Sequence, residues 1–248
     1  MANDTEYPIR VDKVFKSFGE QKVLDGLSLQ VHAGETLAVL GRSGTGKSVL
    51  LKVMIGLHSP DSGSVRMLDQ DMAALDPAQL IEVRKQLGFL FQQAALYDSM
   101  TVGQNVEFPL ARHTNLSPQD RLSKARDLLA SVGMEHETEK LPSQISGGMQ
   151  KRVGLARALA LDPKILLFDE PTAGLDPITA GEIAELIVDL KEKRKMTAVV
   201  VSHDLHTTKR FADRLILIAN GAIRAEGSFA DLEANHDEFV TKYLQNAA

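Results

Sequence analysis

The stretch Gly41-Arg42-Ser43-Gly44-Thr45-Gly46-Lys47-Ser48 decides how this chain is expected to fold. It fits the pattern G-x-x-x-x-G-K-[ST], in which glycines let backbone N–H groups close around phosphate oxygens at the start of a helix. An expected strand over 35–40 runs into it, so the pattern lies in its required place between a strand and a helix. Lys47 is expected to reach the β- and γ-phosphates of a nucleotide, and Ser48 to offer a hydroxyl to Mg²⁺. The alternative is a chance match in a glycine-rich turn.

An apolar strand that ends in two acids, Ile165-Leu166-Leu167-Phe168-Asp169-Glu170, supplies the carboxylates that such a loop requires. Asp169 suits the Mg²⁺ shell, directly or through water, and Glu170 is placed to polarise an attacking water. A strand ending in a solvated acidic turn is the common alternative. The phosphate loop upstream argues against it, because the Mg²⁺ held there needs oxygen ligands.

A second turn of similar chemistry lies between these two segments. Ser146-Gly147-Gly148 opens a helix, and its glycines leave backbone N–H groups bare for another anion. The phosphate loop already surrounds one side of the γ-phosphate, so a second donor set makes sense if it comes from another subunit. The simplest closed arrangement is a two-fold dimer that sandwiches two nucleotides. Gly174-Leu175-Asp176 would then lie near the dimer seam.

Three further residues admit two interpretations each. Gln92 follows the expected strand 89–91 and could touch Mg²⁺ or the attacking water, or be a solvated turn residue. His203 closes the expected strand 198–202 and could bond the γ-phosphate, or simply cap the next helix. Phe18 could stack on an adenine ring, a contact worth about 0.5–1.5 kcal/mol beyond its area burial, or be a core aromatic.

Turn signals and hydrophobic periodicity divide the chain into an α/β core interrupted by a helical insertion. We expect one domain, with its core over 8–93 and 161–227, a helical subdomain over 94–160 and a tail over 228–248. The expected strands cover 8–15, 26–32, 35–40, 64–68, 89–91, 165–169, 198–202 and 215–218. The expected helices cover 47–55, 117–133, 148–161, 177–194 and 205–212. Four tail residues have helical spacing and would pack on their own core or on a second copy: Phe239, Val240, Tyr243 and Leu244.

The composition excludes several classes of function. A net charge of -5 over 248 residues leaves no electrostatic footprint for nucleic acid. The chain has no cysteine, which excludes disulfides, thiol catalysis and zinc–thiolate sites. The longest apolar runs suit buried strands and are too short to span a bilayer, and the N-terminus lacks the pattern of a signal peptide. Work at a membrane would therefore require another chain.

These motifs, in this order and spacing, resemble the nucleotide-binding subunit of ATP-binding-cassette (ABC) transporters over about residues 9–227. The resemblance implies a P-loop NTPase fold with an antiparallel β subdomain and a helical insertion. It also implies an ATPase that uses ATP and Mg²⁺ as a homodimer. Two departures from the family pattern, Ile145 for leucine and Met149 for glutamine, put the role of the fifth signature side chain in doubt.

The resemblance also assigns roles to individual residues. It implies catalytic roles for Glu170, His203, Gln92 and Lys47, and metal ligation by Ser48, Gln92 and Asp169. The residues that it implies to contact ATP are Phe18, Gly41, Arg42, Ser43, Gly44, Thr45, Gly46, Lys47, Ser48, Val49, Ser146, Gly147, Gly148 and Met149.

The segment after Gln92 and the run 168–179 narrow the resemblance to ATPases paired with Mce-type permeases. Those resemble the maintenance-of-lipid-asymmetry systems, which move phospholipids across the envelope of Gram-negative bacteria. The partners implied are permease subunits and an Mce-domain substrate-binding protein, and the location implied is the cytoplasmic face of the bacterial inner membrane. Amino-acid or osmolyte importers and lipoprotein-release systems are the alternatives, because their sequences differ little in this region. A stand-alone P-loop enzyme is disfavoured, since a kinase has no use for a Ser-Gly-Gly helix.

A soluble ATPase must pass its motion to a membrane partner through an exposed surface. Five apolar residues that follow Gln92 are candidates for a groove that takes a permease helix, and some of them would instead lie in the core of the helical insertion. These residues are Leu96, Tyr97, Met100, Val102 and Phe108.

Overall fold

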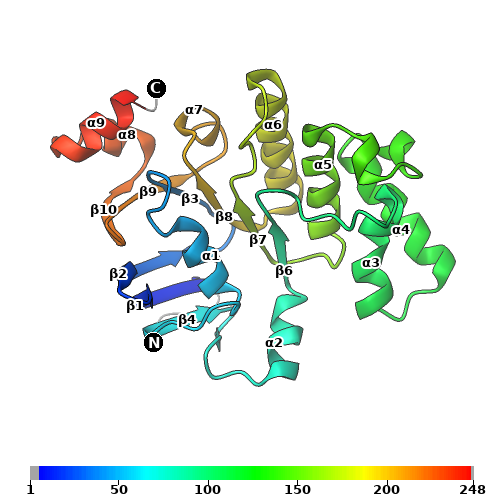
Figure 1. The fold of residues 1–248 in the computed structure, drawn as a ribbon, viewed down its shortest axis with the longest axis horizontal. Coiled ribbons are helices and arrows are strands. Elements are labelled where there is room, and N and C mark those ends of the chain that lie inside the picture. The colour runs from blue at the N-terminus through cyan, green and yellow to red at the C-terminus, as the bar shows by residue number, and fades with distance from the viewer. Residues whose placement is uncertain (1–5, 247–248) are drawn as a thin grey trace.

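The computed structural model describes residues 6–246 and contains two sheets flanked by helices (Figure 1). The larger sheet has the strand order β10-β9-β3-β8-β7-β6. Its strands are β3 (Thr36–Leu40), β6 (Leu87–Leu90), β7 (Ile165–Asp169), β8 (Thr197–Ser202), β9 (Arg214–Ala219) and β10 (Ala222–Gly227). This is the α/β P-loop fold that the sequence predicts. Within residues 6–246, none of the helices is both long and apolar enough to cross a bilayer.

The five strands from β9 to β6 pair in parallel, and β10 runs antiparallel to β9. Every residue of β3, β7 and β8 is buried, as expected for a parallel sheet that is covered on both faces. β8 lies between β3 and β7, although it follows both in the sequence. The segments that leave the carboxyl ends of these three neighbouring strands therefore meet at one edge of the sheet.

The smaller sheet is antiparallel and has the order β2-β1-β4-β5. Its strands are β1 (Ile9–Phe18), β2 (Gln21–Val31), β4 (Ser62–Met67) and β5 (Gln70–Asp71). β2 begins at Gln21, so the prediction that it starts at residue 26 was wrong. Gly26 has φ +70 and lies where the pairing slips, since Val14 faces Leu27 whereas Lys16 faces Leu24. The glycine therefore marks a bulge within the strand and not a turn before it.

Three helices form most of the insertion and gather on one side of the molecule (Figure 1). They are α3 (Val102–His113), α4 (Pro118–Ser131) and α5 (Gly147–Ala158), joined by 3₁₀ turns at Glu135–Glu137 and Pro142–Gln144. Ser117 caps α4 as predicted, accepting the Asp120 N–H at 3.2 Å. The three helices share one apolar core with α6 (Pro177–Arg194) and with one face of the large sheet.

Several element boundaries differ from the predictions. α5 starts at Gly147 and ends at Ala158, three residues before the predicted end. α7 (Leu205–Thr208) stops short of residue 212, because the chain tightens after Thr208: the N–H groups of Arg210 and Phe211 bond to carbonyls only three residues back. α1 (Lys47–Met54) and α6 agree closely with the predictions.

A helix within the predicted core was missed altogether. α2 (Pro77–Arg84) is capped by Asp76, whose side chain accepts the N–H groups of Ala78 and Gln79 at 2.8 and 2.9 Å. The Asp-Pro pair at its start is the same signal that predicts α6 from Asp176 and Pro177. A weakly amphipathic pattern hid it, since Val83 is the one buried residue of this short helix.

The tail ends in two helices, α8 (Phe229–Glu233) and α9 (Glu238–Asn246). Val240 and Tyr243 of α9 are buried against a small core that includes Leu40 of β3 and Leu205 of α7. Of the two placements predicted for the tail, the structure has the packing on its own core. Residues 247 and 248 of the predicted tail lie outside the described residues.

Candidate functional site

The phosphate loop joins β3 to α1 and is closed by its own lysine. The Lys47 side chain is 6% exposed, and its Nζ donates to the carbonyl oxygens of Gly41 at 2.8 Å and Arg42 at 3.1 Å. Gly46 has φ +96, and a Cβ there would come within 2.7 Å of the Val23 carbonyl oxygen, so this position requires glycine. The first N–H groups of α1 have no acceptor within the helix and can bind phosphate oxygens.

A pair of oxygens links α1 to the end of β7. The Ser48 hydroxyl donates to Oδ1 of Asp169 at 2.6 Å, and Asp169 is buried. Hydroxyl and carboxylate oxygens are ligands that Mg²⁺ accepts, and it commonly takes one or two carboxylates together with substrate phosphates. These two residues therefore fit a magnesium ion bound beside a nucleotide.

The second acid of the strand is held by groups from two other elements. Glu170 follows β7 with φ +52, and its Oε2 lies 2.7 Å from Nδ1 of His203, which follows β8. Its Oε1 lies 3.8 Å from Nζ of Lys47. The carboxylate is nearly buried, whereas more than half of the His203 side chain is exposed. An acid that is held in place and yet open to water on one side can act as a general base.

These elements enclose a pocket of about 350 Å³. It brings together the phosphate loop, the first turn of α1, Gln92 and Glu170, as the sequence predicts. Val23 of β2 also lines it and was not predicted, because nothing in its local sequence distinguishes it from the other apolar residues of a strand. The lining residues are Val23, Ser43, Gly44, Gly46, Lys47, Ser48, Val49, Gln92 and Glu170.

Phe18, Arg42 and Thr45 lie outside this pocket. Phe18 ends β1 with 45% of its surface exposed, its ring 5.4 Å from that of His58 in an edge-on arrangement. It is therefore not a core aromatic, and the Lys16 ammonium lies over its ring, 5.5 Å from the ring centre. Arg42 and Thr45 line a separate hollow of about 220 Å³ that the tail closes with Phe239.

The Ser-Gly-Gly turn does not line the phosphate pocket of its own chain. Ser146 caps α5 by accepting the Met149 N–H at 3.3 Å, and both Ser146 and Gly147 are exposed. α5 and α1 lie on opposite sides of the β6–β7 pair (Figure 1). Gly148 is buried, and a Cβ there would come within 2.4 Å of Cγ2 of Thr179 in α6. The Met149 side chain packs on the helical core instead of facing outward.

A buried lysine on α5 also belongs to the surroundings of the site, although it was not predicted from the sequence. Lys151 is 5% exposed, and its Nζ donates to the carbonyl oxygens of Gln92 and Glu170, the latter at 3.0 Å. Burial lowers the pKa of Lys151 to about 8, against the raising effect of Asp169 and Glu170. Burial also lowers the pKa of Lys47, against the same two carboxylates. A lone lysine on the apolar face of a helix is the signal that could have revealed it.

Comparison with known proteins decides the family. The sequence model of the ABC transporter family matches residues 24–173, which is more than half of the 248 residues. The chain belongs to the ABC transporter family. The phosphate loop, the acidic strand and the Ser-Gly-Gly helix are thus parts of one ATP-binding cassette.

Relatives of two transport classes match this cassette. It is 37% identical over 236 residues to the methionine import ATP-binding protein MetN of Brucella abortus, covering 95% of this chain and 64% of that protein. It is 40% identical over 228 residues to the intermembrane phospholipid transport system ATP-binding protein MlaF of Haemophilus influenzae, covering 92% and 86%. The cassette thus spans just under two thirds of the length of the methionine import relative.

A solved structure of another cassette has the same fold. It is the dimeric post-hydrolysis state of the ATP-binding cassette MJ0796 bound to ADP and phosphate. The TM-score is 0.82 at 34% sequence identity, and the match covers 89% of this chain and 98% of that one.

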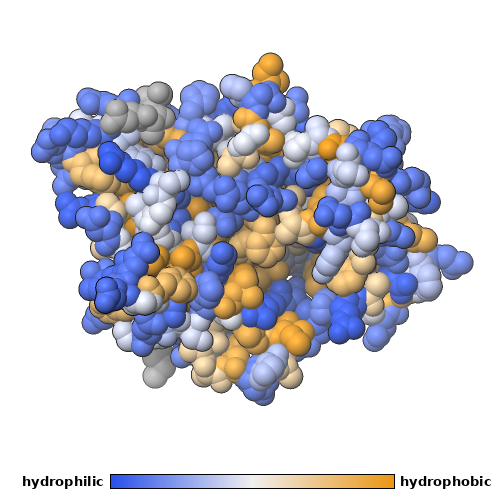
Figure 2. Space-filling view, in the orientation of Figure 1, coloured by the Kyte–Doolittle hydropathy of each residue, from blue (hydrophilic) through white to orange (hydrophobic). Residues whose placement is uncertain are grey.

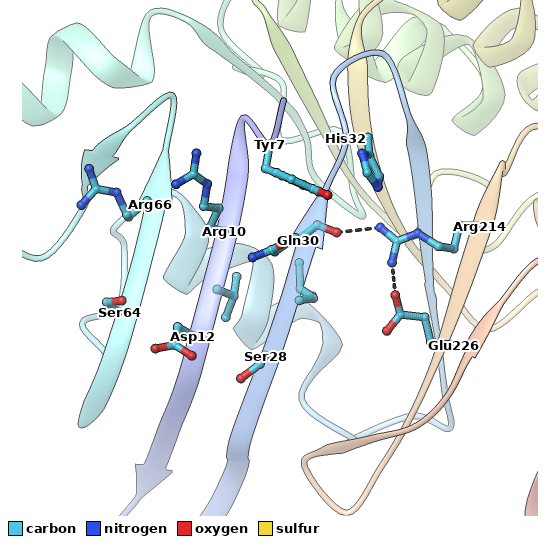
Figure 3. Close-up of a pocket in the computed structure, with 12 residues that line it drawn as sticks. Tyr7, Arg10, Asp12, Ser28, Gln30, His32, Ser64, Arg66, Arg214 and Glu226 are labelled. Carbon is cyan, nitrogen blue, oxygen red and sulfur yellow. Dashed lines mark hydrogen bonds and ion pairs between the residues drawn. The ribbon is translucent and has the colours of Figure 1, made fainter. Parts of the chain in front are cut away.

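Another hollow, of about 620 Å³, lies on the outer face of the antiparallel sheet (Figure 3). Polar side chains of β1, β2 and β4 line it, and Arg214 of β9 closes one side. Arg214 donates to the Gln30 carbonyl oxygen at 2.6 Å and to Glu35 at 2.6 and 3.0 Å, and it also pairs with Glu226. The Glu35 carboxylate raises the pKa of this guanidinium. Arg214 therefore fastens the two sheets together.

An apolar groove of about 500 Å³ runs between β6, α2 and α3 of the cassette. Figure 2 shows apolar surface gathered over α2 and β6. Two of the five residues predicted for a groove line it, Tyr97 and Phe108, and their rings lie 5.0 Å apart. Val102 is fully buried at the start of α3, so it lies in the core, as was expected for some of the five. Leu96 also packs against the helical core.

Proposed function

We propose that this cassette binds ATP with Mg²⁺ and hydrolyses it between two copies of the chain, and that the cycle drives a membrane permease. One observation carries the proposal. Lys47, Ser48, Gln92 and Glu170 line one pocket, and Asp169 and His203 bond to Ser48 and Glu170 there, whereas the exposed start of α5 at Ser146 does not line it. A second copy related by a two-fold axis would bring each Ser146 to the other copy's nucleotide.

In this proposal the phosphate loop and Lys47 hold the phosphates. Lys47 now bonds to carbonyls of its own loop, and a phosphate anion offers its ammonium a stronger partner. Ser48 and Asp169 would hold Mg²⁺, with Gln92 beside them in the same pocket. When bound, the ion would neutralise charge on the phosphates as the bond to the leaving oxygen breaks.

Glu170 is proposed as the general base for the attacking water. His203 holds one carboxylate oxygen at 2.7 Å, which fixes the direction of the other. When Lys47 turns toward phosphate, Oε1 of Glu170 loses its cation and is free to accept a proton from water. His203 is half exposed and can also donate to the γ-phosphate.

The apolar groove is proposed to bind a helix of the permease. Its lining combines aromatic rings with aliphatic and basic side chains, a composition that suits an amphipathic helix. It also borders the segment after Gln92, so a change at the γ-phosphate would reach a bound helix over a short path.

For the cargo we propose phospholipid, moved by an Mce-type permease with an Mce-domain binding protein in a bacterial envelope. The similarity to MlaF and the run 94–110 after Gln92 support this choice. The second candidate is methionine import, supported by nearly equal identity to MetN.

The test uses the full chain purified with its co-expressed permease and reconstituted into liposomes. We expect phospholipid to stimulate ATP hydrolysis and a fluorescent phospholipid to be transported only with ATP. The same complex with Glu170→Gln is the matched control and should transport none. Methionine-dependent hydrolysis without phospholipid movement would replace the cargo proposal and leave the ATPase proposal standing.

A further inference from the structure

One face of α5 forms hydrogen bonds to the segment that carries Gln92. Lys151 and Arg157 lie six residues apart on this helix, with Gly154 between them, so all three share a face. Arg157 donates to the carbonyl oxygens of Ala94 at 2.6 Å and Ala95 at 2.7 Å. A Cβ at Gly154 would come within 3.1 Å of the Ala94 Cβ, so helix and segment touch directly. The segment after Gln92 is therefore fixed to α5 at several points.

Lys151 adds a connection that the rest of this face lacks. Its ammonium donates to both the Gln92 carbonyl and the Glu170 carbonyl, so it joins the segment after β6 to the residue after β7. Placing a cation where it is 5% exposed is costly unless it is well bonded. Apolar residues pack well on the rest of α5, so simple packing does not require a lysine there.

The same helix begins at the Ser146 turn. Five residues separate Ser146 from Lys151, which is about 7.5 Å along a stiff helix at 1.5 Å per residue. A shift of the Gln92 or Glu170 backbone is therefore passed to the exposed start of α5. In the proposed dimer that start faces the nucleotide of the other copy.

We propose that Lys151 is a positioning residue that connects the two nucleotide sites. It ties the Gln92 and Glu170 backbones of one copy to the helix that completes the opposite site, so that occupancy of one pocket sets the geometry of the other. This inference rests on the proposed dimer. It assigns to Lys151 no contact with nucleotide or water.

The test compares Lys151→Met, which keeps the length and removes the ammonium, with Lys151→Arg, which keeps donors for both carbonyls. Lys124→Met is the matched control, because Lys124 lies in the same helical region and forms an exposed ion pair with Asp162. Each change is made in the full chain, alone and together with Glu170→Gln. Three quantities are measured: the Kd of ATP for dilute monomer, the ATP-dependent dimerisation constant in the Glu170→Gln background, and kcat.

We expect Lys151→Met to leave the monomer Kd within twofold while it weakens dimerisation and lowers kcat by at least tenfold each. Lys151→Arg should recover most of both losses, and Lys124→Met should change none of the three quantities. A purely structural role predicts instead a loss of ATP affinity in step with thermal stability.

Wild-type dimerisation and kcat in Lys151→Met would overturn the proposal, and so would equal losses in all three quantities. Should Lys151→Met not fold, Lys151→Gln, which keeps one donor, is measured in its place: an intermediate loss of dimerisation supports the proposal and none overturns it. If the Glu170→Gln parent stays monomeric with ATP, the dimer of the proposed function has failed, and that failure is visible before any Lys151 variant is compared.

Discussion

At the residue scale, the site is a set of short contacts between groups that lie far apart in the sequence. Ser48 meets Asp169 across 121 residues, and His203 meets Glu170 across 33. Each partner was expected near the nucleotide because its motif has a known chemical task. The contacts of Lys151 were not expected, since its acceptors are backbone carbonyls, which any sequence supplies.

Glu170→Gln gives the first prediction at this scale. The amide cannot take a proton from water, so kcat should fall by at least about 100-fold, within the range typical of a lost general base. ATP binding should persist, because Lys47 and the loop are untouched. Phosphate release and size-exclusion chromatography with ATP measure both effects. Glu182→Gln, which alters an exposed ion pair with Arg152, is the control and should hydrolyse ATP at the normal rate.

The second prediction concerns the hydroxyl of Tyr243. It is buried near the Gly41 backbone and has no hydrogen bond of ordinary geometry to the described residues. Burial raises the pKa of Tyr243 from 10.0 to about 12. As pH rises above about 10, the unfolded chain therefore loses this proton first, and the free energy of unfolding falls until the pH passes the folded pKa.

Tyr243→Phe should remove this alkaline decline, and urea unfolding at about pH 9 and about pH 11.5 measures it. A two-unit shift corresponds to at most about 2–3 kcal/mol between these conditions. Tyr97→Phe serves as the control, because 47% of that side chain is exposed. An equal decline in Tyr243→Phe and wild type would contradict the prediction.

At the element scale, local signals predicted the helices that carry site residues. They failed where one residue type occurs in two kinds of backbone structure. Asp176-Pro177 and Ser117-Pro118 both start helices as expected. Gly26 has turn chemistry, yet it lies within a strand, because the opposite strand decides whether a positive φ becomes a turn or a bulge. That choice depends on residues paired across the sheet, which periodicity along one segment does not reveal.

The two glycines at the start of α5 give a prediction for this scale. Alanine at Gly148 would push Thr179 away from Asp176, whose carboxylate accepts the Thr179 hydroxyl at 2.6 Å and caps α6. Gly148→Ala should therefore lower stability without nucleotide by about 1–3 kcal/mol, as overpacking commonly does.

Gly147→Ala is its matched control. The nearest atom to a Cβ at Gly147 is 3.8 Å away, which is ordinary contact, and alanine favours helix over glycine. Thermal unfolding of both variants without nucleotide makes the comparison. Equal melting temperatures would show that Thr179 gives way freely and that the contact between α5 and α6 is loose.

At the scale of the whole molecule, the fold class, the order of the motifs and the helical insertion could all be predicted from the sequence. The position of β8 between β3 and β7 could not, because strand order in a parallel sheet is set by crossovers and leaves no local pattern. The placement of the tail could not be predicted, for a similar reason. Helical spacing at Val240 and Tyr243 shows an apolar face but not the surface that covers it.

The proposed dimer gives a prediction for the molecule as a whole. Ile178 at the start of α6 is 77% exposed, beside the turn that is expected at the seam. Ile178→Asp should leave the monomer stable, since an acid suits a helix start, and should weaken ATP-dependent dimerisation in the Glu170→Gln background by at least about tenfold.

Sedimentation with and without ATP measures this effect. Leu122→Asp is the control, because Leu122 is 45% exposed on α4, away from the proposed seam. Undiminished dimerisation of the Ile178 variant would place the interface on another face of the molecule.

The strand order has a consequence for how the chain is made. Within residues 6–246, β3 pairs only with β8 and β9, which are both synthesised after it, although each of its five residues is buried in the finished sheet. On a ribosome adding about 5–20 residues per second, Thr36–Leu40 would wait roughly 8–30 s for residues 197–202 to appear. Throughout that interval the phosphate loop follows an apolar segment that has no partner strand yet. The nascent chain therefore needs shielding from aggregation, and ATP can act as a folding ligand only after residues 197–202 have been made.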